Sequence, residues 1–316
     1  MTEFVLNPVL PCGPSGHPDL LNHIGGTPLL RLDRIAAGLR PGIELHAKAE
    51  HLNPSGSLKD RPVRAMILAA AASGALTPDR RILDATSGNA GIAYAMIGAV
   101  LGYRVTLCLP ANASAERKRI LGIYGARIIE TDPAQGSDGA RRKARELALA
   151  DPGRYFHVDQ YDNAANWRAH YESTGPEIWG QSGGRVSHFV AGVGTSGLFM
   201  GAARRLKELN PALVAVAVQP DSPGHGLAGL KHMASAIVPG IYDPALADAQ
   251  VTVSTAEGQA MARRLALQEG LLVGPSSGAS VSAALRLART LPEGAVVATV
   301  LFDSGARYLA DSFWEA

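Results

Sequence analysis

One lysine of the chain stands in an unusual setting for a surface lysine. Lys59 ends the run NPSGSLK at residues 53–59, which is small and polar, and a pattern typical of an apolar helix follows it. The positive end of a helix disfavours a lysine there, so the placement indicates a use. A nucleophilic amine must lose its proton, which partial burial or a cationic neighbour such as Arg61 or Arg64 favours. From this run alone, a reactive lysine and an ordinary surface lysine remain equally open.

Lys59 stands in one of four loops rich in glycine, serine and threonine, each of which follows a strand-like run and opens a helix. In such loops the backbone can approach a ligand closely, and the amide groups at a helix N-terminus attract anions. One loop of this kind is ordinary, but four indicate a single ligand that is held from several sides. The loops are NPSGSLKD (53–60), TSGNAG (86–91), GVGTSG (192–197) and GPSSGAS (274–280), with a weaker fifth in FDSGARYL (302–309).

The run GVGTSG also satisfies the glycine pattern of dinucleotide-binding enzymes, in which GxGxxG follows a strand. That function requires an acidic residue at the end of the next strand, where it holds a ribose. The next strand-like run carries Gln219 near its end, and Asp221 comes only after Pro220. A phosphate-binding loop for another cofactor therefore fits this run better than a nicotinamide site.

The loops depend on strands and helices that alternate along the chain. Short apolar runs predict the strands, and stretches with helical spacing that are rich in Ala, Leu and Arg predict the helices. Alternation of this kind predicts parallel sheets covered on both faces, with ligands at the carboxyl ends of the strands. The predicted strands cover 44–50, 81–85, 104–110, 126–132, 187–193, 213–220 and 295–302. The predicted helices cover 61–73, 89–101, 114–124, 137–150, 197–209, 256–269 and 279–290.

Length and composition limit the classes of function. With 316 residues, 47% hydrophobic and 18% charged, the chain is long and apolar enough for a large globular core. A net charge of +2 gives no field that would favour nucleic acid or an anionic membrane. Cys12 and Cys108 do not form a disulfide framework, and we expect Cys108 to be a buried, inert thiol. The N-terminus lacks the pattern of a signal peptide, so we expect a soluble, cytoplasmic protein.

Together, the motifs resemble those of the fold-type II pyridoxal-phosphate enzymes and, more narrowly, those of the cysteine synthase/cystathionine β-synthase family. The resemblance covers nearly the whole chain, and the order and spacing of the motifs match. The motifs that carry it are GGTPLLRL (25–32), NPSGSLKDRP (53–62), TSGNAGIA (86–93), AERKRILGIYGARII (115–129), TGPEIW (174–179), GVGTSG, GPSSGAS and SGARYL (304–309).

This resemblance implies an α/β fold of two three-layer domains, like that of the tryptophan synthase β subunit, with pyridoxal 5'-phosphate in the cleft between them. It divides the chain into an irregular extension over 1–18, a larger cofactor-binding domain from 19–50 and 163–316, and a smaller domain over 51–162 that binds the substrate carboxylate. It also implies a homodimer that acts on an amino acid and a sulfur donor. We expect no nucleic acid, membrane or metal to take part.

The resemblance further assigns residues to the cofactor. Lys59 would hold pyridoxal phosphate covalently and later remove the proton from the substrate Cα, while Asn89 would bond the phenolic oxygen of the cofactor. Leu198 stands where the family usually has a second threonine beside the phosphate, which weakens one hydroxyl contact. The residues that would form the phosphate cup are Gly194, Thr195, Ser196 and Gly197.

Ser276 would face the pyridine nitrogen of the cofactor. A hydroxyl cannot keep that nitrogen protonated as a carboxylate does, so the ring is a weaker electron sink. Weaker delocalisation suits β-elimination better than transamination or racemisation. A helix N-cap is the alternative role for this serine, and the two roles are compatible.

The resemblance also assigns residues to the substrate. A carboxylate requires several fixed donors, and the loop with Thr86, Ser87, Gly88 and Asn89 would supply them to the α-carboxylate. Gln160 would contact the same carboxylate, although an exposed loop residue is an equally open alternative. Lys231 stands with a histidine where the O-acetylserine enzymes of the family tend to have Gln-Gly. It would pair with a phosphate or another anionic group of the substrate, and a solvated loop lysine is the equal alternative.

The implied reaction is β-replacement by a transferase of cysteine biosynthesis. An activated serine loses its β-substituent, and the α-aminoacrylate intermediate adds a sulfur nucleophile to give L-cysteine or an S-substituted cysteine. The sequence leaves open whether the donor is O-acetylserine or O-phosphoserine, and which sulfur nucleophile is used. The alternatives are a cystathionine-forming condensation of serine with homocysteine, a serine or threonine dehydratase of the same fold, and a catalytically idle binding module.

Overall fold

The computed structural model describes residues 19–86 and 88–315, which divide into two compact units. The four-stranded unit contains residues 19–24 and 59–160, and the six-stranded unit contains residues 25–58 and 161–315. The expectations for the extension over 1–18 with Cys12, and for Ser87, lie outside the described residues. No helix in the described ranges is both long and apolar enough to cross a membrane.

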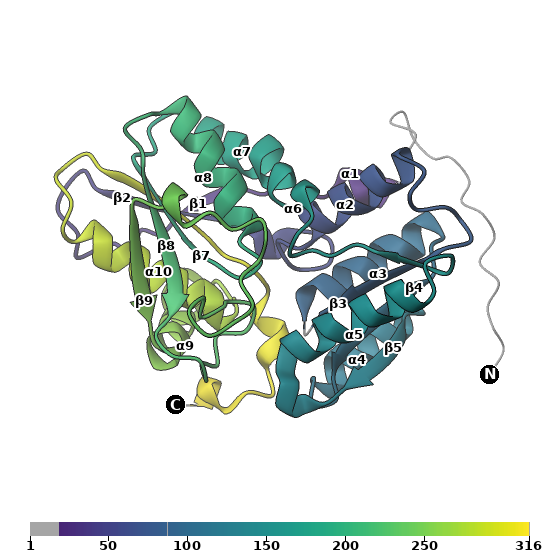
Figure 1. Ribbon diagram of the computed structural model, residues 1–316. Coiled ribbons are helices and arrows are strands. Elements are labelled where there is room, and N and C mark those ends of the chain that lie inside the picture. Colours follow the sequence, from purple (N-terminus) through teal and green to yellow (C-terminus); the bar gives the residue numbers. More distant parts are fainter. Residues whose placement is uncertain (1–18, 87, 316) are drawn as a thin grey trace. The chain divides into compact units, whose positions relative to one another are not determined.

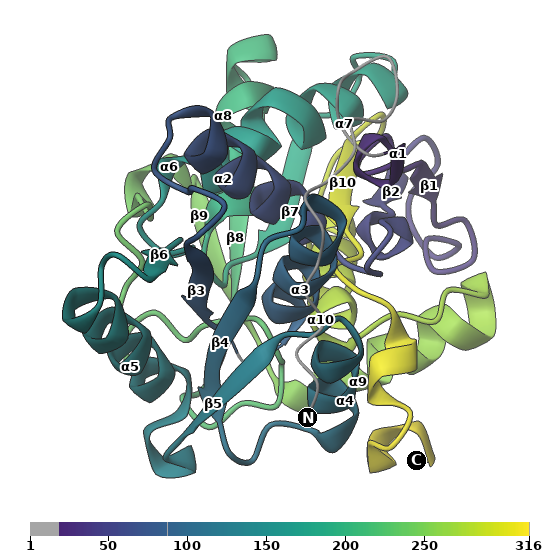
Figure 2. The same ribbon diagram turned by 90° about the vertical axis from the view of Figure 1, so that its right-hand side faces the viewer.

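The sheet of the four-stranded unit is parallel throughout, with the order β5-β4-β3-β6 (Figure 2). Its strands follow one another with helices between them, which is the arrangement that the alternating sequence pattern predicts. All carboxyl ends therefore meet at one edge of the sheet. The strands are β3 (Arg81–Ala85), β4 (Val105–Pro110), β5 (Arg127–Thr131) and β6 (Tyr155–His157).

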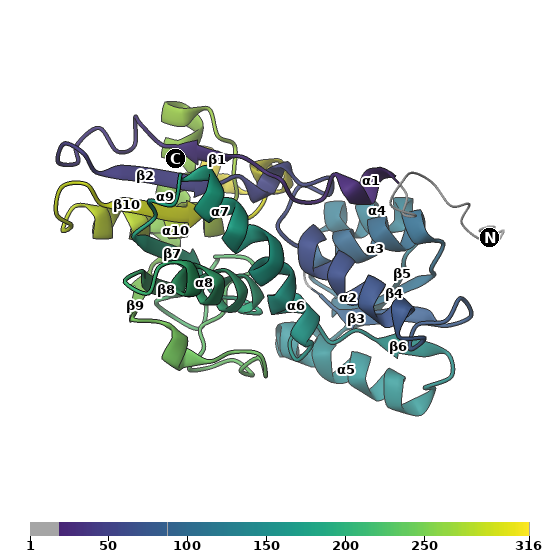
Figure 3. The same ribbon diagram turned by 90° about the horizontal axis from the view of Figure 1, so that it is seen from above.

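Helices cover both faces of this sheet (Figure 3). On one face, α5 packs against an apolar cluster that contains Leu83, Ala85 and Cys108. On the other face, α3 approaches the strands closely because a Cβ at Gly98 would lie 2.4 Å from a methyl group of Val105. The helices of this unit are α1 (Asp19–Asn22), α2 (Asp60–Ala72), α3 (Asn89–Leu101), α4 (Ala115–Ile123) and α5 (Gly136–Ala150).

The sheet of the six-stranded unit has the order β1-β2-β10-β7-β8-β9. Only its edge strand β1 runs antiparallel to its neighbour, and the other neighbours are parallel (Figure 1). The strands are β1 (Leu29–Arg31), β2 (Glu44–Lys48), β7 (His188–Gly192), β8 (Val214–Pro220), β9 (Ala249–Val253) and β10 (Val296–Val300).

Alternate residues of these central strands face two separate apolar clusters, as a three-layer unit requires. Val190, Val216 and Val297 face α9 and α10, while Phe189 and Ala215 face α7 and α8. A π-helical turn, Leu265–Glu269, continues α9, and another, His170–Thr174, joins α6 to α7. The helices are α6 (Ala164–Ala169), α7 (Gly175–Gln181), α8 (Gly197–Leu209), α9 (Thr255–Arg264) and α10 (Pro275–Ala288).

The predicted fold class of two three-layer α/β units is confirmed, and each predicted strand and helix has a counterpart close to its predicted range. The main error concerns α10, which begins at Pro275 and not near residue 279. The small residues there were interpreted as a loop, but they let α10 pack closely on α9. A Cβ at Gly278 would lie 2.0 Å from the carbonyl oxygen of Gly258. The short strands β1, β6 and β9 and the helices α1, α6 and α7 were not predicted.

Candidate active site

The turn that precedes Lys59 is fixed by hydrogen bonds to the motif over 302–309. Leu58 N donates to Phe302 O at 2.9 Å, and Ser304 N donates to Gly56 O at 3.1 Å. The guanidinium of Arg307 donates to the carbonyl of Ser55. The chain is therefore held up to the residue before Lys59.

Lys59 itself is the N-cap of α2, as the sequence predicts, and its side chain is partly buried. Its carbonyl oxygen accepts the first bond of the helix, from Val63 N at 3.1 Å. The side chain of Lys59 makes no cap hydrogen bond to the helix. Partial burial favours the neutral amine, which is the form that a nucleophile requires.

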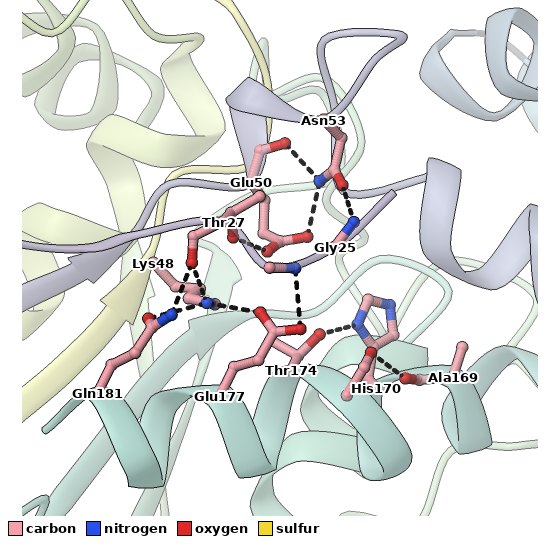
Figure 4. A network of polar contacts seen from close by, with 12 residues as sticks. Gly25, Thr27, Lys48, Glu50, Asn53, Ala169, His170, Thr174, Glu177 and Gln181 are labelled. Carbon is pink, nitrogen blue, oxygen red and sulfur yellow. Dashed lines mark hydrogen bonds and ion pairs between the residues drawn. The ribbon is translucent and has the colours of Figure 1, made fainter. Parts of the chain in front are cut away.

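A polar network in the six-stranded unit supports the same turn from another side (Figure 4). The buried ammonium of Lys48 lies 2.6 Å from Glu177 Oε2 on α7, and Glu177 Oε1 accepts a bond from Gly26 N at 3.1 Å. Thr27 Oγ1 then donates to the buried Glu50 at 2.7 Å, and Asn53 Nδ2 donates to the same carboxylate at 2.9 Å. The motifs GGTPLLRL and TGPEIW thus meet in one network that ends at the first residue of the NPSGSLK turn.

The glycine-rich loop over 192–197 leads from β7 into α8. Its Ser196 is the N-cap of α8 and has a φ of 69°, a left-handed conformation that is uncommon outside glycine. Gly194 has no room for a side chain, because a Cβ would lie 1.9 Å from the carbonyl oxygen of Gly229. The hydroxyl of Ser196 is buried and has no hydrogen-bond partner among the described residues. This loop offers a buried hydroxyl and the backbone amides of a helix start to a ligand.

Ser276 lies in the first turn of α10 and is 3% exposed. The N-cap of α10 is Gly274, so the alternative role of Ser276 as the N-cap is wrong. Two other serines of the motif tie the helix to its surroundings. Ser277 Oγ accepts from Phe302 N at 2.8 Å, and Ser280 Oγ accepts from Gly192 N at 3.0 Å. The structure therefore brings together α10, the glycine-rich loop and the segment that holds the turn before Lys59.

The loop over 86–91 of the four-stranded unit is held by one side chain. Thr86 Oγ1 accepts from Gly88 N at 3.1 Å and from Gly91 N at 3.2 Å, and Asn89 is the first residue of α3. Gln160 is 4% exposed, so the alternative of an exposed loop residue is wrong. Its amide donates to Ala85 O at 2.8 Å, which places it beside the start of this loop.

Sequence reasoning missed the buried acid behind this loop. Asp84 lies in β3 and is 1% exposed, and burial raises the pKa of its carboxyl to about 6. Its oxygens accept from Tyr94 Oη at 2.5 Å and from Gln160 N at 3.2 Å. The only signal in the sequence was an acidic residue inside the apolar run RILDA.

Lys231 is 8% exposed, so the alternative of a solvated loop lysine is wrong. Its ammonium lies 5.2 Å from the centroid of the Tyr161 ring, which is within the range of a cation–π interaction. Its backbone amide donates to Val193 O at 2.9 Å, so the residue lies beside the glycine-rich loop. Cys108 is buried as expected, and burial raises the pKa of its thiol to about 11.

Comparison with known proteins agrees with this geometry. A family model for the pyridoxal-phosphate dependent enzymes matches residues 20–303, and the chain belongs to that family. A cysteine synthase of Aquifex aeolicus is 46% identical over 299 residues, which cover 93% of this chain and 91% of that protein.

Solved structures give the same result. The crystal structure of a cysteine synthase from Entamoeba histolytica superposes with a TM-score of 0.89 at 32% identity and covers 98% of this chain and 95% of its own. An O-acetylserine dependent cystathionine β-synthase from Helicobacter pylori superposes with a TM-score of 0.88 at 35% identity and covers 93% of this chain and 98% of its own. The prediction of a pyridoxal-phosphate dependent enzyme of the cysteine synthase type is confirmed.

The residues present fit the cofactor. A phosphate monoester requires donors that approach it without side chains in the way, and the glycine-rich loop has both properties. The buried hydroxyl of Ser196 lacks a partner among the described residues, and the packing at Gly194 excludes a side chain.

Proposed function

We propose that this chain synthesises L-cysteine by β-replacement on an activated serine, with pyridoxal phosphate as cofactor. The observation that carries the proposal is the glycine-rich loop at the start of α8. The left-handed Ser196, its buried hydroxyl and the packing at Gly194 are costly features that a bound phosphate explains.

Pyridoxal phosphate supplies an electron sink for the carbanion at Cα. In our proposal Lys59 would hold the cofactor covalently and take the proton from Cα of the substrate, Asn89 would bond the phenolic oxygen, and Ser276 would face the pyridine nitrogen. Gly194, Thr195, Ser196 and Gly197 bind the phosphate.

The loop over 86–91 binds the substrate α-carboxylate in this proposal, through Thr86, Ser87, Gly88 and Asn89, together with Gln160. Two features support this role. Thr86 holds the backbone amides of the loop in a compact turn, and α3 begins at Asn89, so its N-terminus favours an anion. The residue before Gln160, Asp159, has a φ of 50°, which is strained for a non-glycine residue.

Spectroscopy and product analysis test the function. The purified protein should bind pyridoxal phosphate and absorb at the wavelength of a protonated imine in the visible range. O-acetylserine or O-phosphoserine with sulfide should give L-cysteine, and Lys59→Ala should lower turnover by about a thousandfold or more because the nucleophile is lost. A colourless protein that cannot be reconstituted would contradict the proposal.

The acceptor separates the alternatives. Homocysteine as the preferred acceptor would identify a cystathionine-forming enzyme. Steady release of pyruvate or 2-ketobutyrate without any thiol would identify a dehydratase. A protein that binds the cofactor and the amino acid but releases no product would be a binding module.

Lys231 tests which activated serine is used. We propose that its ammonium pairs with the phosphate of O-phosphoserine, because it lies beside the glycine-rich loop and is almost buried. Lys231→Ala should then lower kcat/KM for O-phosphoserine about thirtyfold and change the value for O-acetylserine less than about threefold. Lys207→Ala is the matched control, since Lys207 pairs with Asp248 on the surface at 2.8 Å. Unchanged turnover of O-phosphoserine in Lys231→Ala would exclude this role.

The assembly is proposed from the family resemblance, and the location from the expectation stated for the sequence. We propose a homodimer in the cytoplasm that needs no nucleic acid, membrane or metal. Light scattering coupled to size-exclusion chromatography would measure the mass in solution, and a monomer would contradict the proposal.

A further inference from the structure

Asp84 joins three parts of the four-stranded unit behind the loop over 86–91. Its Oδ1 accepts from Ala85 N at 2.7 Å, within β3. Its Oδ2 accepts from Tyr94 Oη of α3 at 2.5 Å and from the backbone N of Gln160, after β6, at 3.2 Å. The side chain of Gln160 donates in turn to Ala85 O at 2.8 Å. One carboxylate thus fixes both segments that we assign to the substrate carboxylate.

The bonding pattern favours the ionised form of this acid. Both backbone groups that face it are N–H donors, and an ionised carboxylate accepts at every position. A protonated carboxyl must donate from one oxygen, and only the hydroxyl of Tyr94 can reverse its role to accept. Protonation therefore weakens the bonds to Ala85 and Gln160, because hydrogen bonds to a charged acceptor are the stronger ones.

Few other titratable groups of the described residues face this carboxyl. His157 of β6 places its Nε2 3.8 Å from Asp84 Oδ1, and Tyr94 faces it from α3. Cys108 of β4 belongs to the cluster under α5, on the opposite face of the sheet. Besides burial, Asp84 helps to raise the pKa of Cys108, and Lys143 and Glu146 of α5 also act on that thiol, but neither is among the groups that shift the pKa of Asp84.

We propose that Asp84 is a positioning residue whose ionised carboxylate holds Gln160 and the start of the 86–91 loop in the geometry that receives the substrate α-carboxylate. The proposal rests on the assignment of these two segments to the substrate under the proposed function. Asp84 itself does not touch the substrate.

The proposal sets a pH dependence of substrate binding. Burial raises the pKa of Asp84 to about 6, while His157 and the hydrogen bond from Tyr94 oppose that rise. Above this pKa the acid is ionised and the loop is held. As the pH falls below it, the KM for the amino-acid donor should rise and level off about tenfold higher once the acid is protonated, while kcat changes little.

Three variants of the holoenzyme test this dependence between pH 5 and pH 7.5. Asp84→Asn places an NH₂ group among donors and cannot ionise, so its KM should be about tenfold higher at pH 7.5 and nearly independent of pH. Tyr94→Phe removes a donor to the carboxylate, which raises the pKa of Asp84 and should move the midpoint of the KM profile to higher pH. His157→Gln removes an imidazole that lowers this pKa in its protonated form, and it should move the midpoint in the same direction.

The outcomes are distinct. If Asp84→Asn keeps the same pH profile of KM as the unchanged protein, or if the midpoint does not move in Tyr94→Phe, the positioning role is overturned. Should Asp84→Asn not fold, Tyr94→Phe and His157→Gln still decide, since each leaves the acid in place. A holoenzyme that binds the cofactor but performs no β-replacement would reject the proposed function and not the role of Asp84. In that case the affinity for a bound amino acid, measured from the cofactor spectrum across the same pH range, takes the place of KM.

Discussion

The two loops that we assign to anions are held in different ways. The glycine-rich loop of the six-stranded unit is shaped by close backbone packing, and the hydroxyl of Ser196 is left without a partner among the described residues. The loop over 86–91 of the four-stranded unit is shaped by hydrogen bonds that its backbone amides donate to the side chain of Thr86, with Asp84 and Gln160 behind it. One loop depends on the absence of side chains and the other on their presence.

This difference is the one that we expect from the two ligands proposed for these loops, the cofactor phosphate and the substrate carboxylate. A resident cofactor stays bound, so its phosphate site can be rigid and insensitive to pH, and backbone packing provides both properties. A substrate carboxylate must enter and leave in every turnover. A loop held by a small hydrogen-bond network, with an acid whose pKa is about 6, has a stability that the pH can change. Substitutions in the glycine-rich loop should therefore act on cofactor affinity, and those in the 86–91 loop on KM.

Among substitutions in the two loops, the largest effect should come from Gly194→Ala. The new Cβ would lie 1.9 Å from Gly229 O, and backbone cannot yield as a flexible side chain does. Overpacking at this site should destabilise the cofactor-binding conformation of the loop by about 3 kcal/mol. This free energy corresponds to a loss of roughly a hundredfold in affinity for pyridoxal phosphate. Equilibrium dialysis of the apoprotein against the cofactor measures this loss. Gly180→Ala in α7 is the matched control, since nothing lies within 4 Å of its Cβ position, and it should leave the affinity unchanged.

A smaller loss should follow from Ser196→Ala. The variant removes a buried hydroxyl that has no protein partner among the described residues, so the apoprotein should lose no stability. A hydrogen bond to a charged acceptor contributes about 1.5–3 kcal/mol, so cofactor affinity should fall roughly tenfold to hundredfold, with KM for the amino acid nearly unchanged. Thermal denaturation of the apoprotein and cofactor titration separate the two quantities. A destabilised apoprotein with full cofactor affinity would show that the hydroxyl is structural.

The sequence predicted the glycine-rich loop better than the network behind the other one. Small residues after an apolar strand are visible in the sequence, and so are Lys59 and the start of α3 at Asn89. Asp84 was not predicted because its partners Tyr94 and Gln160 lie 10 and 76 residues away. Only the folded sheet brings them together.

The predicted start of α10 was wrong for a related reason. The small residues at Gly274 and Gly278 resemble a loop, but they serve the close approach of Asp303 and of α9 to the helix. Composition shows that space is needed there but not which partner fills it. The domain bounds and the roles of the site residues stay predictions.

The smallest effect should come from Thr86→Val, which tests the side-chain half of the comparison. The variant removes the oxygen that accepts from Gly88 N and Gly91 N, although Gly91 N keeps a bond to Gly88 O at 3.0 Å. The lost hydrogen bonds contribute about 1 kcal/mol to holding the loop in its binding geometry. The variant should therefore raise KM for the amino-acid donor roughly fivefold and leave cofactor affinity unchanged. Thr106→Val in β4 is the control, because its buried hydroxyl has no partner among the described residues and its removal should be neutral or stabilising. If Thr86→Val lost as much cofactor affinity as Ser196→Ala, the assignment of the cofactor to one loop and of the substrate carboxylate to the other would be wrong.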